Sequence, residues 1–145
     1  MPINIKNRIR GKQNKKTGQR GEEIAERFLK TLGFLHIEPM ETGWTIQWRN
    51  GKPYNAFPKK KVSGDFHAME PGTARYVHVE TKTRQADRLP WSAFESHQTD
   101  KMNQKAKDGA LVLVVWVRSP VEIKCVQWPV VGFGPRKSIR WENIK

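Results

Sequence analysis

The sequence predicts an α/β domain in which a central mixed β-sheet is flanked by helices. Three observations predict it: a helical apolar stripe near the N-terminus, two alternating segments joined by Pro71-Gly72, and a strongly apolar run later in the chain. A chain of 145 residues suits one domain with an ordinary core. We expect residues 1–20 to form a flexible basic arm and residues 21–145 to form that single domain.

The first predicted helix runs from Arg20 to Leu32, and Gly33 supplies its stop signal. Its apolar residues recur at helical spacing: Ile24, Ala25, Phe28, Leu29 and Leu32. On a wheel of about 100° per residue, Glu22 lies about 90° from the centre of this stripe, Glu26 about 130° and Glu23 nearly opposite. Glu22 is therefore the acid best placed to face the sheet, with Glu26 as the substitute. A role for Glu22 at the positive end of the helix dipole is the alternative.

Residues 62–69 and 75–82 are predicted to form a β-hairpin around the Pro71-Gly72 turn. If the turn is centred just after Gly72, the numbers of cross-strand partners sum to 145, which places Asp65 opposite Glu80. Side-chain alternation gives an apolar face that carries Phe66, Ala68, Val77, Val79 and Thr81. The polar face carries Asp65, His67, His78, Glu80 and Lys82.

Asp65, Glu80 and Lys82 on one face form the pattern D…E-x-K. Carboxylates directly opposite on a sheet have Cβ atoms roughly 5 Å apart and repel each other, so a cation between them is favourable. Two carboxylates and the backbone carbonyl of Thr81 suit Mg²⁺, with Mn²⁺ able to substitute. Lys82 would then lie where it can orient or deprotonate a water, or stabilise charge on a phosphate. For E-x-K alone, a solvated charged face is the alternative.

A second helix is predicted after a loop from Thr83 to Pro90. Ser92 and Glu95 have the spacing of a capping box, and the helix is expected to continue to about Lys107, with Gly109 as its stop. Phe94, Gln98 and Met102 share one face of it. An amide in this stripe needs a partner, and the Lys82 and phosphate region of the neighbouring sheet is one candidate. A purely structural glutamine is the other.

The remaining segments complete the sheet. Residues 110–117 are apolar on both faces and indicate a central, doubly covered strand. Residues 121–128 are expected to form a further strand, residues 132–135 a loop, and residues 138–144 a short closing helix.

Residues 41–61 are predicted to form a projecting hairpin, because Asn50-Gly51 is a strong signal for a two-residue turn. Aromatic and basic residues alternate in it: Trp44, Trp48, Arg49, Lys52, Tyr54, Phe57, Lys59, Lys60 and Lys61. Such residues can stack on exposed bases and contact phosphates. Equally, the tryptophans can belong to a core.

Charge indicates a polyanionic partner. The chain has 27 Lys and Arg against 14 Asp and Glu, a net charge of +13, which favours binding to nucleic acid. Phosphate contacts are expected from Arg8, Arg10, Lys12, Lys15, Lys16, Arg20, Lys59, Lys60, Lys61, Arg84 and Arg88. A merely solubilising tail is the alternative for the N-terminal arm.

Cysteine content and hydropathy predict the compartment. The single Cys125 excludes a disulfide framework, and no apolar run reaches the roughly 18–20 residues that span a bilayer. We expect a soluble protein of the cytoplasm, associated with the nucleoid, or of a host cytoplasm if the source is a phage or mobile element.

Three local matches together resemble the PD-(D/E)xK nuclease superfamily, and most closely its RecU-type Holliday junction resolvases. Gly21-Glu22-Glu23-Ile24-Ala25 is similar to the G-E-x-x-A helix start of several relatives. Ser63-Gly64-Asp65-Phe66 followed by Val79-Glu80-Thr81-Lys82 matches the strand motifs. Leu89-Pro90 with Phe94-x-x-His97-Gln98-x-x-x-Met102 resembles the H-Q-x-x-x-M helix. Gly64 replaces the proline of the superfamily, and Thr81 stands where relatives usually have Val or Ala.

The resemblance implies a restriction-endonuclease-like core of order α-β-β-β-α-β, and a homodimeric, Mg²⁺-dependent endonuclease with two metal sites. Such an enzyme would cut two strands of a four-way junction symmetrically and leave 5′-phosphate and 3′-hydroxyl ends. Asp65 and Glu80 would bind the metal, Glu22 would be an additional metal or water ligand, and Lys82 would orient water or stabilise the transition state. Gln98 would support the site or contact phosphate.

Three alternatives stay open. The chain could be a non-catalytic basic nucleic-acid-binding protein that keeps the nuclease fold. It could be a restriction or repair nuclease of the same superfamily. Finally, the polar face could hold a transition-metal site. His67 and His78 are expected to be cross-strand partners there, and imidazoles suit Zn²⁺ or Mn²⁺ better than Mg²⁺.

Overall fold

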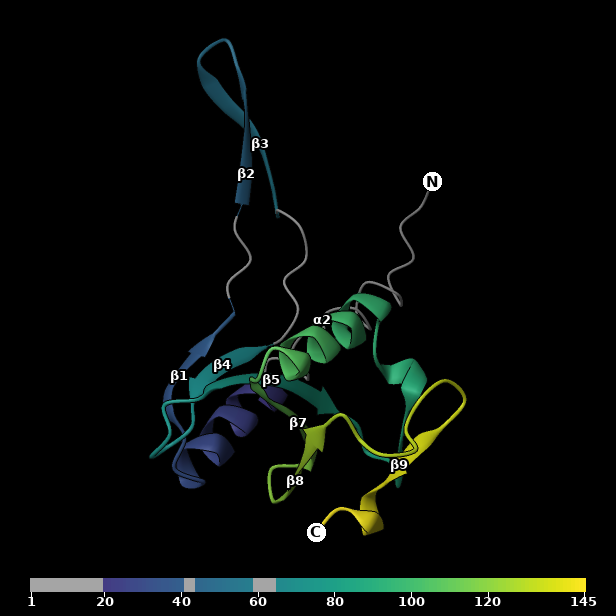
Figure 1. Cartoon of the computed structure of the whole chain (residues 1–145). Helices are drawn as coiled ribbons and strands as arrows, with labels where there is room; N and C mark the ends of the chain where they lie inside the picture. The colour runs from purple at the N-terminus through teal and green to yellow at the C-terminus, as the bar shows by residue number, and fades with distance from the viewer. Residues whose placement is uncertain (1–19, 41–43, 59–64) are drawn as a thin grey trace.

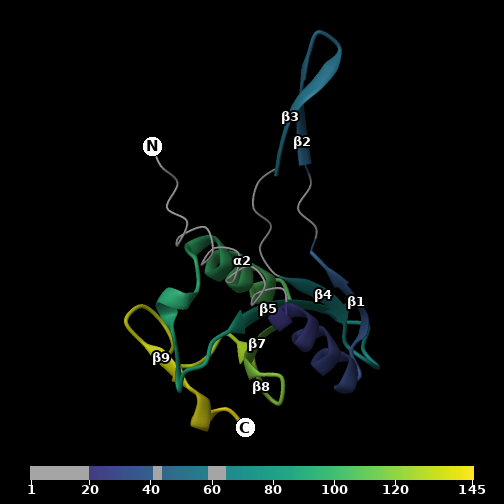
Figure 2. The ribbon, with the colours of Figure 1, turned by 180° about the vertical axis from the view of Figure 1, so that it is seen from behind.

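The computed structural model describes residues 20–40, 44–58 and 65–145. The predicted mixed α/β architecture is confirmed: a five-stranded sheet of order β1-β4-β5-β7-β8 has helices on both faces (Figures 1 and 2). The described part of the N-terminal helix covers residues 20–31. The other elements are β1 (Leu35–Pro39), β2 (Trp44–Arg49), β3 (Lys52–Pro58), β4 (Phe66–Met69), β5 (Tyr76–Thr83), β6 (Arg88–Pro90), η1 (Trp91–Ala93), α2 (Ser96–Lys107), β7 (Leu111–Ser119), β8 (Glu122–Trp128), β9 (Ser138–Arg140) and η2 (Trp141–Asn143).

The N-terminal helix packs on one face of the sheet and ends as predicted at Gly33, whose φ is 89°. The apolar cluster beneath it consists of Ile24, Ala25, Leu29, Phe66, Ala68, Val77, Val79, Leu113, Val115 and Val117. Leu32 is 50% exposed, so its placement in the buried stripe is wrong. The reason is that the helical hydrogen bonds give way to a turn at residues 32–33, which removes Leu32 from the buried face.

α2 and the C-terminal segments cover the other face. Their cluster contains Leu89, Phe94, Met102, Val112, Val114, Trp116, Trp128, Ile139 and Ile144. β7, the predicted central strand, pairs in parallel with β5 and antiparallel with β8. It is buried on both faces, as its uninterrupted apolar run indicates.

Within β4 and β5 the register is the one expected, but Asp65, the expected partner of Glu80, lies before β4 and outside the paired residues. Phe66 pairs with Val79, His67 with His78, Ala68 with Val77 and Met69 with Tyr76. The predicted strand residues 62–64 lie outside the described residues.

Two expectations need correction. The predicted loop of residues 83–90 contains the end of β5 and all of β6, and the predicted closing helix of residues 138–144 is β9 followed by η2. β6 and β9 pair with each other, a long-range contact that local periodicity does not reveal. β1, an edge strand interrupted by a register shift, is too short to be marked by a pattern.

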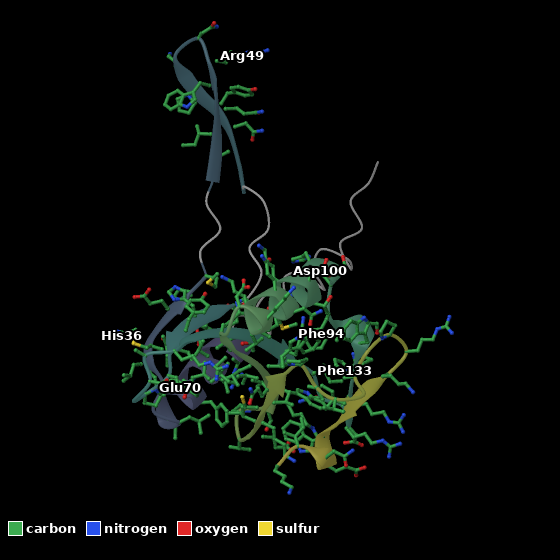
Figure 3. All side chains as sticks on the ribbon, in the orientation of Figure 1. His36, Arg49, Glu70, Phe94, Asp100 and Phe133 are labelled. Carbon is green, nitrogen blue, oxygen red and sulfur yellow. The ribbon has the colours of Figure 1, made fainter. Side chains whose placement is uncertain are left out.

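The predicted hairpin with an Asn50-Gly51 turn is present as β2–β3, a separate two-stranded sheet. Both turn residues have positive φ, 50° and 70°, which suits a tight reversal between strands. The hairpin stands away from the main sheet, with Arg49 near its tip (Figure 3). Ile46, Trp48 and Tyr54 are 50%, 63% and 58% exposed, so Trp48 is not a core residue. No helix in the described part of the chain is long and apolar enough to cross a membrane.

Candidate active site

Asp65 lies immediately before β4, and hydrogen bonds of its backbone and of its carboxylate hold it there. Its backbone N–H donates to the carbonyl of Val79 (2.9 Å), and its carbonyl accepts from the N–H of Met40 (3.0 Å). Its Oδ2 accepts from the backbone N–H of Thr81 at 2.6 Å. The carboxylate therefore crosses the hairpin and lies against the Glu80–Lys82 stretch of β5.

Glu80, Lys82 and Gln98 form a second group of contacts. Nε2 of Gln98 donates to Oε1 of Glu80 at 2.7 Å, and Nζ of Lys82 donates to Oε1 of Gln98 at 2.9 Å. Lys82 Nζ also lies 3.6 Å from Oε1 of Glu80, which is only 2% exposed. The amide presents its NH₂ to the anion and its carbonyl to the cation, so both charges fix its orientation.

An aromatic ring completes the surroundings of Lys82. Its Nζ lies 4.8 Å from the ring centroid of Phe94, a distance at which the ring face attracts a cation. Phe94 is buried and packs against Trp128 and Phe133, with centroids 5.5 and 5.9 Å away. Figure 3 labels Phe94 and Phe133, which lie beside one another on the α2 side of the sheet. The ammonium group is thus confined by an acid, an amide and a ring.

The start of α2 differs from the prediction and explains why Gln98 is in the site. Ser92 lies in η1, and the N-cap of α2 is Glu95, with Gln98 as its reciprocal capping-box partner. Oε1 of Gln98 accepts from the Glu95 backbone N–H at 2.9 Å. One amide oxygen therefore serves both the helix cap and Lys82.

Glu22 contacts Asp65 from the N-terminal helix. Burial, then the charge of Asp65, then a side-chain hydrogen bond between the two raise the pKa of Glu22. Burial also raises the pKa of Asp65, against the opposing effects of the Thr81 N–H and the charge of Lys82. Two acids with raised pKa values in contact mark a place where negative charge is concentrated and a cation would be stabilised.

Close packing of the helix on β5 brings Glu22 to this position. Gly21 is buried, and a Cβ atom there would overlap Oγ1 of Thr83. Glu26, the expected substitute for Glu22, forms an ion pair with Lys30 on the helix surface (3.4 Å). Of the two acids, Glu22 is the one that lies at Asp65.

The candidate site contains oxygen donors of the type that suits a hard divalent ion. The carboxylates of Asp65, Glu80 and Glu22 and the Thr81 carbonyl are the ligand types that Mg²⁺ prefers. The ammonium of Lys82 interacts with two acids: its charge lowers the pKa of Asp65, and its Nζ lies 3.6 Å from Oε1 of Glu80. Within residues 20–40, 44–58 and 65–145, no three His, Cys, Asp or Glu side chains form a metal cluster.

The two histidines lie beside this site. His78 is 1% exposed, and burial, then the charge of Lys105, lowers its pKa to about 4. His67 stacks on Tyr76, and its Nε2 lies 3.5 Å from Oε2 of Glu38. Among the described residues, no three histidine, cysteine or carboxylate side chains are grouped so that they could hold a metal, whereas a closed zinc site needs four ligands.

Of the basic residues expected at DNA, Arg20, Arg84 and Arg88 are described and exposed. The others lie outside the described residues: Arg8, Arg10, Lys12, Lys15, Lys16, Lys59, Lys60 and Lys61.

Two site residues escaped the sequence reasoning. Phe94 was expected on the face of a helix, but it precedes α2 and supports Lys82 instead. Glu95 was expected inside the helix, but it is the N-cap. The available signal was the E-x-x-Q spacing of Glu95 and Gln98, which is also a capping-box spacing.

Comparison with solved structures gives the same architecture. The chain is similar to Hjc from Archaeoglobus fulgidus, a Holliday junction resolvase from an archaeal hyperthermophile, with a TM-score of 0.54 and 15% sequence identity. The match covers 84% of this chain and 87% of that one. No protein-family model matches the sequence, and no curated protein does. The chain therefore has the restriction-endonuclease-like fold of Hjc.

Proposed function

We propose that this protein is a Mg²⁺-dependent DNA endonuclease that cuts four-way junctions. The observation that carries the proposal is the Glu80–Gln98–Lys82 network, in which Glu80 is buried and the other two are half-buried, beside the Glu22–Asp65 pair. A buried acid and a half-buried amine joined by one amide, next to two acids of raised pKa, concentrate functional groups beyond what folding needs. The fold shared with a Holliday junction resolvase supports this choice of substrate.

Asp65, Glu80 and the Thr81 carbonyl would hold the metal ion, and Glu22 would bind it directly or through a water. When bound, Mg²⁺ supplies charge stabilisation at a phosphate oxygen and a lowered pKa for a water molecule. Mn²⁺ has compatible ligand preferences and is expected to substitute.

Lys82 would orient the attacking water or stabilise negative charge on the phosphate. Its ammonium is held by Gln98 and by the ring of Phe94, so little rotamer freedom is left to lose on substrate binding. Gln98 would position Lys82 relative to Glu80. Attack on phosphorus in line with the leaving group would give 5′-phosphate and 3′-hydroxyl ends.

A junction offers two strands related by symmetry, so a homodimer with one site in each copy would cut both. A net charge of +13 supports binding to a polyanion of this size. A DNA substrate implies a site of action in the cytoplasm.

Cleavage assays test the proposal directly. The protein would be incubated with Mg²⁺ and a panel of four-way junction, flap, nicked and plain duplex DNA, and the cuts mapped. We expect paired cuts near the branch point of the junction. Glu80→Gln and Lys82→Ala should abolish cleavage and leave junction binding largely intact.

The other outcomes separate the alternatives. If the wild type cuts none of these DNAs with Mg²⁺ or Mn²⁺ but binds them, the protein is a non-catalytic binder. If it cuts flaps or plain duplex in preference to the junction, it is a nuclease of the repair or restriction type.

A further inference from the structure

A cleft beside the candidate active site has an uncompensated positive charge. Its volume is about 430 Å³, and its lining includes Arg20, Gly21, Thr83, Arg84 and Arg118. We name it the arginine cleft. It is formed where the parallel strands β5 and β7 end and the N-terminal helix meets them, and its lining contains three arginines and no acid.

The three arginines differ in how their charge is balanced. Arg118 lies 3.3 Å from Oδ1 of Asp87 and 3.8 Å from Oε2 of Glu122, and its guanidinium lies over the ring of Trp141. Arg118 is therefore held in place, and the two carboxylates largely offset its charge. By contrast, Arg20 and Arg84 are exposed, and neither is within ion-pair distance of a carboxylate in the described part of the chain. These two supply the cleft with its available charge.

The cleft adjoins the catalytic groups through the chain itself. Gly21, one of its lining residues, precedes Glu22, and Thr83 follows Lys82. An anion in the cleft would therefore lie next to the phosphate on which Lys82 and Glu80 act. In a DNA strand, the group in that place is a neighbouring phosphodiester.

We propose that the arginine cleft binds one phosphodiester of the strand to be cut, next to the scissile one, through Arg20 and Arg84. This inference rests on the proposed function and adds to it the position of the cut DNA strand relative to the candidate active site. Guanidinium groups suit the task because their planar forks bind phosphate oxygens in pairs. Their unpaired charge costs little to present in the free protein because both side chains are solvated.

A phosphate scan tests the proposal. Binding of an immobile four-way junction would be measured in EDTA, so that cleavage plays no part. Single phosphates near the branch point would be replaced in turn by neutral methylphosphonates. We expect one position in each cut strand at which the replacement weakens wild-type binding roughly tenfold, the loss of a charge-assisted hydrogen bond. The same replacement should change binding by less than about twofold in Arg84→Gln and Arg20→Gln, because the partner is already missing.

Lys137→Gln is the matched control, since it removes the same charge from an exposed residue outside the cleft. It should keep the wild-type phosphate profile. The proposal is overturned if the wild type responds to no single position, or if Arg84→Gln keeps the full wild-type response. A protein that shows the expected profile but never cleaves would refute the proposed function and leave the phosphate site standing.

Discussion

Gln98 is the residue on which the arrangement of the candidate site depends most. Its amide joins the Glu80 carboxylate, the Lys82 ammonium and the N-cap of α2, over distances of 2.7 to 2.9 Å. Without it, Glu80 and Lys82 remain 3.6 Å apart, and each loses a hydrogen bond in a buried setting.

Gln98→Ala is therefore expected to lower kcat for junction cleavage by roughly ten- to a hundredfold, because Lys82 is no longer held in position. The free energy of unfolding should fall by about 1–3 kcal/mol, the cost of buried polar groups without partners. Single-turnover kinetics and urea denaturation measure the two effects. Gln104→Ala, on an exposed part of the same helix, is the control and should change neither.

Asp65 gives a prediction about pH. Its folded-state pKa is raised by burial above the ordinary value of 3.8, so its contribution to stability is present below that value and is lost as pH rises through the folded-state pKa. In metal-free protein, Asp65→Asn should therefore raise Tm at pH 7 and have little effect near pH 4. Asn keeps an oxygen to accept from the Thr81 N–H.

Thermal scans in EDTA across this pH range measure the difference in Tm between variant and wild type. Mg²⁺ should raise Tm of the wild type at pH 7 and leave the variant nearly unchanged. A difference that is constant across the pH range would contradict the raised pKa.

At the scale of elements, the approach of the N-terminal helix to β5 sets the position of Glu22. Because a Cβ atom at Gly21 would overlap Oγ1 of Thr83, Gly21→Ala should push the helix away and cost about 1–3 kcal/mol of stability. Cleavage activity should fall as well, since Glu22 moves with the helix. Chemical denaturation and activity assays measure both.

The companion variant Thr83→Ala removes Oγ1, so the double variant should recover part of the stability that Gly21→Ala loses. Strictly additive losses would show that the helix does not rest on Thr83. The nearest remaining atom would be the Thr83 Cβ, 3.1 Å from the added one, so recovery should be incomplete.

The β2–β3 hairpin exposes the apolar side chains of Ile46, Trp48 and Tyr54. A two-stranded hairpin is marginal by itself, and Arg49 over the ring of Tyr54 at 5.6 Å adds little. We expect its aromatic residues to stack on bases exposed at the branch point. Trp48→Ala should then weaken junction binding roughly tenfold in fluorescence anisotropy and leave Tm unchanged.

Val121→Ala is the control for that experiment, because Val121 is 90% exposed at the β7–β8 turn and is aliphatic. It should not alter binding. Equal binding by Trp48→Ala and the wild type would exclude Trp48 as a DNA contact.

The elements that sequence predicts well are those whose signals are local. The β4–β5 register followed from one turn and strict alternation, and the β7 strand from an apolar run. Non-local contacts were missed: β9 is a strand because β6 pairs with it, and α2 starts at Ser96 because residues 91–93 form a separate 3₁₀ turn. In the site, the hairpin spacing brought Asp65 to the backbone of Thr81, between Glu80 and Lys82, whereas the ring of Phe94 near Lys82 depends on how α2 docks.

At the scale of the whole molecule, two helices on opposite faces of one sheet deliver their side chains to the same end of β5. Glu22 arrives from one face and Gln98 from the other, and the hairpin supplies Asp65, Glu80 and Lys82 between them. We expect Asp65, Glu80 and Glu22, which come from three separate segments, to bind one ion there.

Anomalous diffraction from crystals soaked in Mn²⁺ tests this claim most directly. The account predicts a manganese peak within about 2.5 Å of carboxylate oxygens from both Asp65 and Glu80, with Glu22 bound to it directly or through a water. A peak held by His67 and His78, or the absence of any peak between Asp65 and Glu80 in crystals with an accessible site, would contradict it.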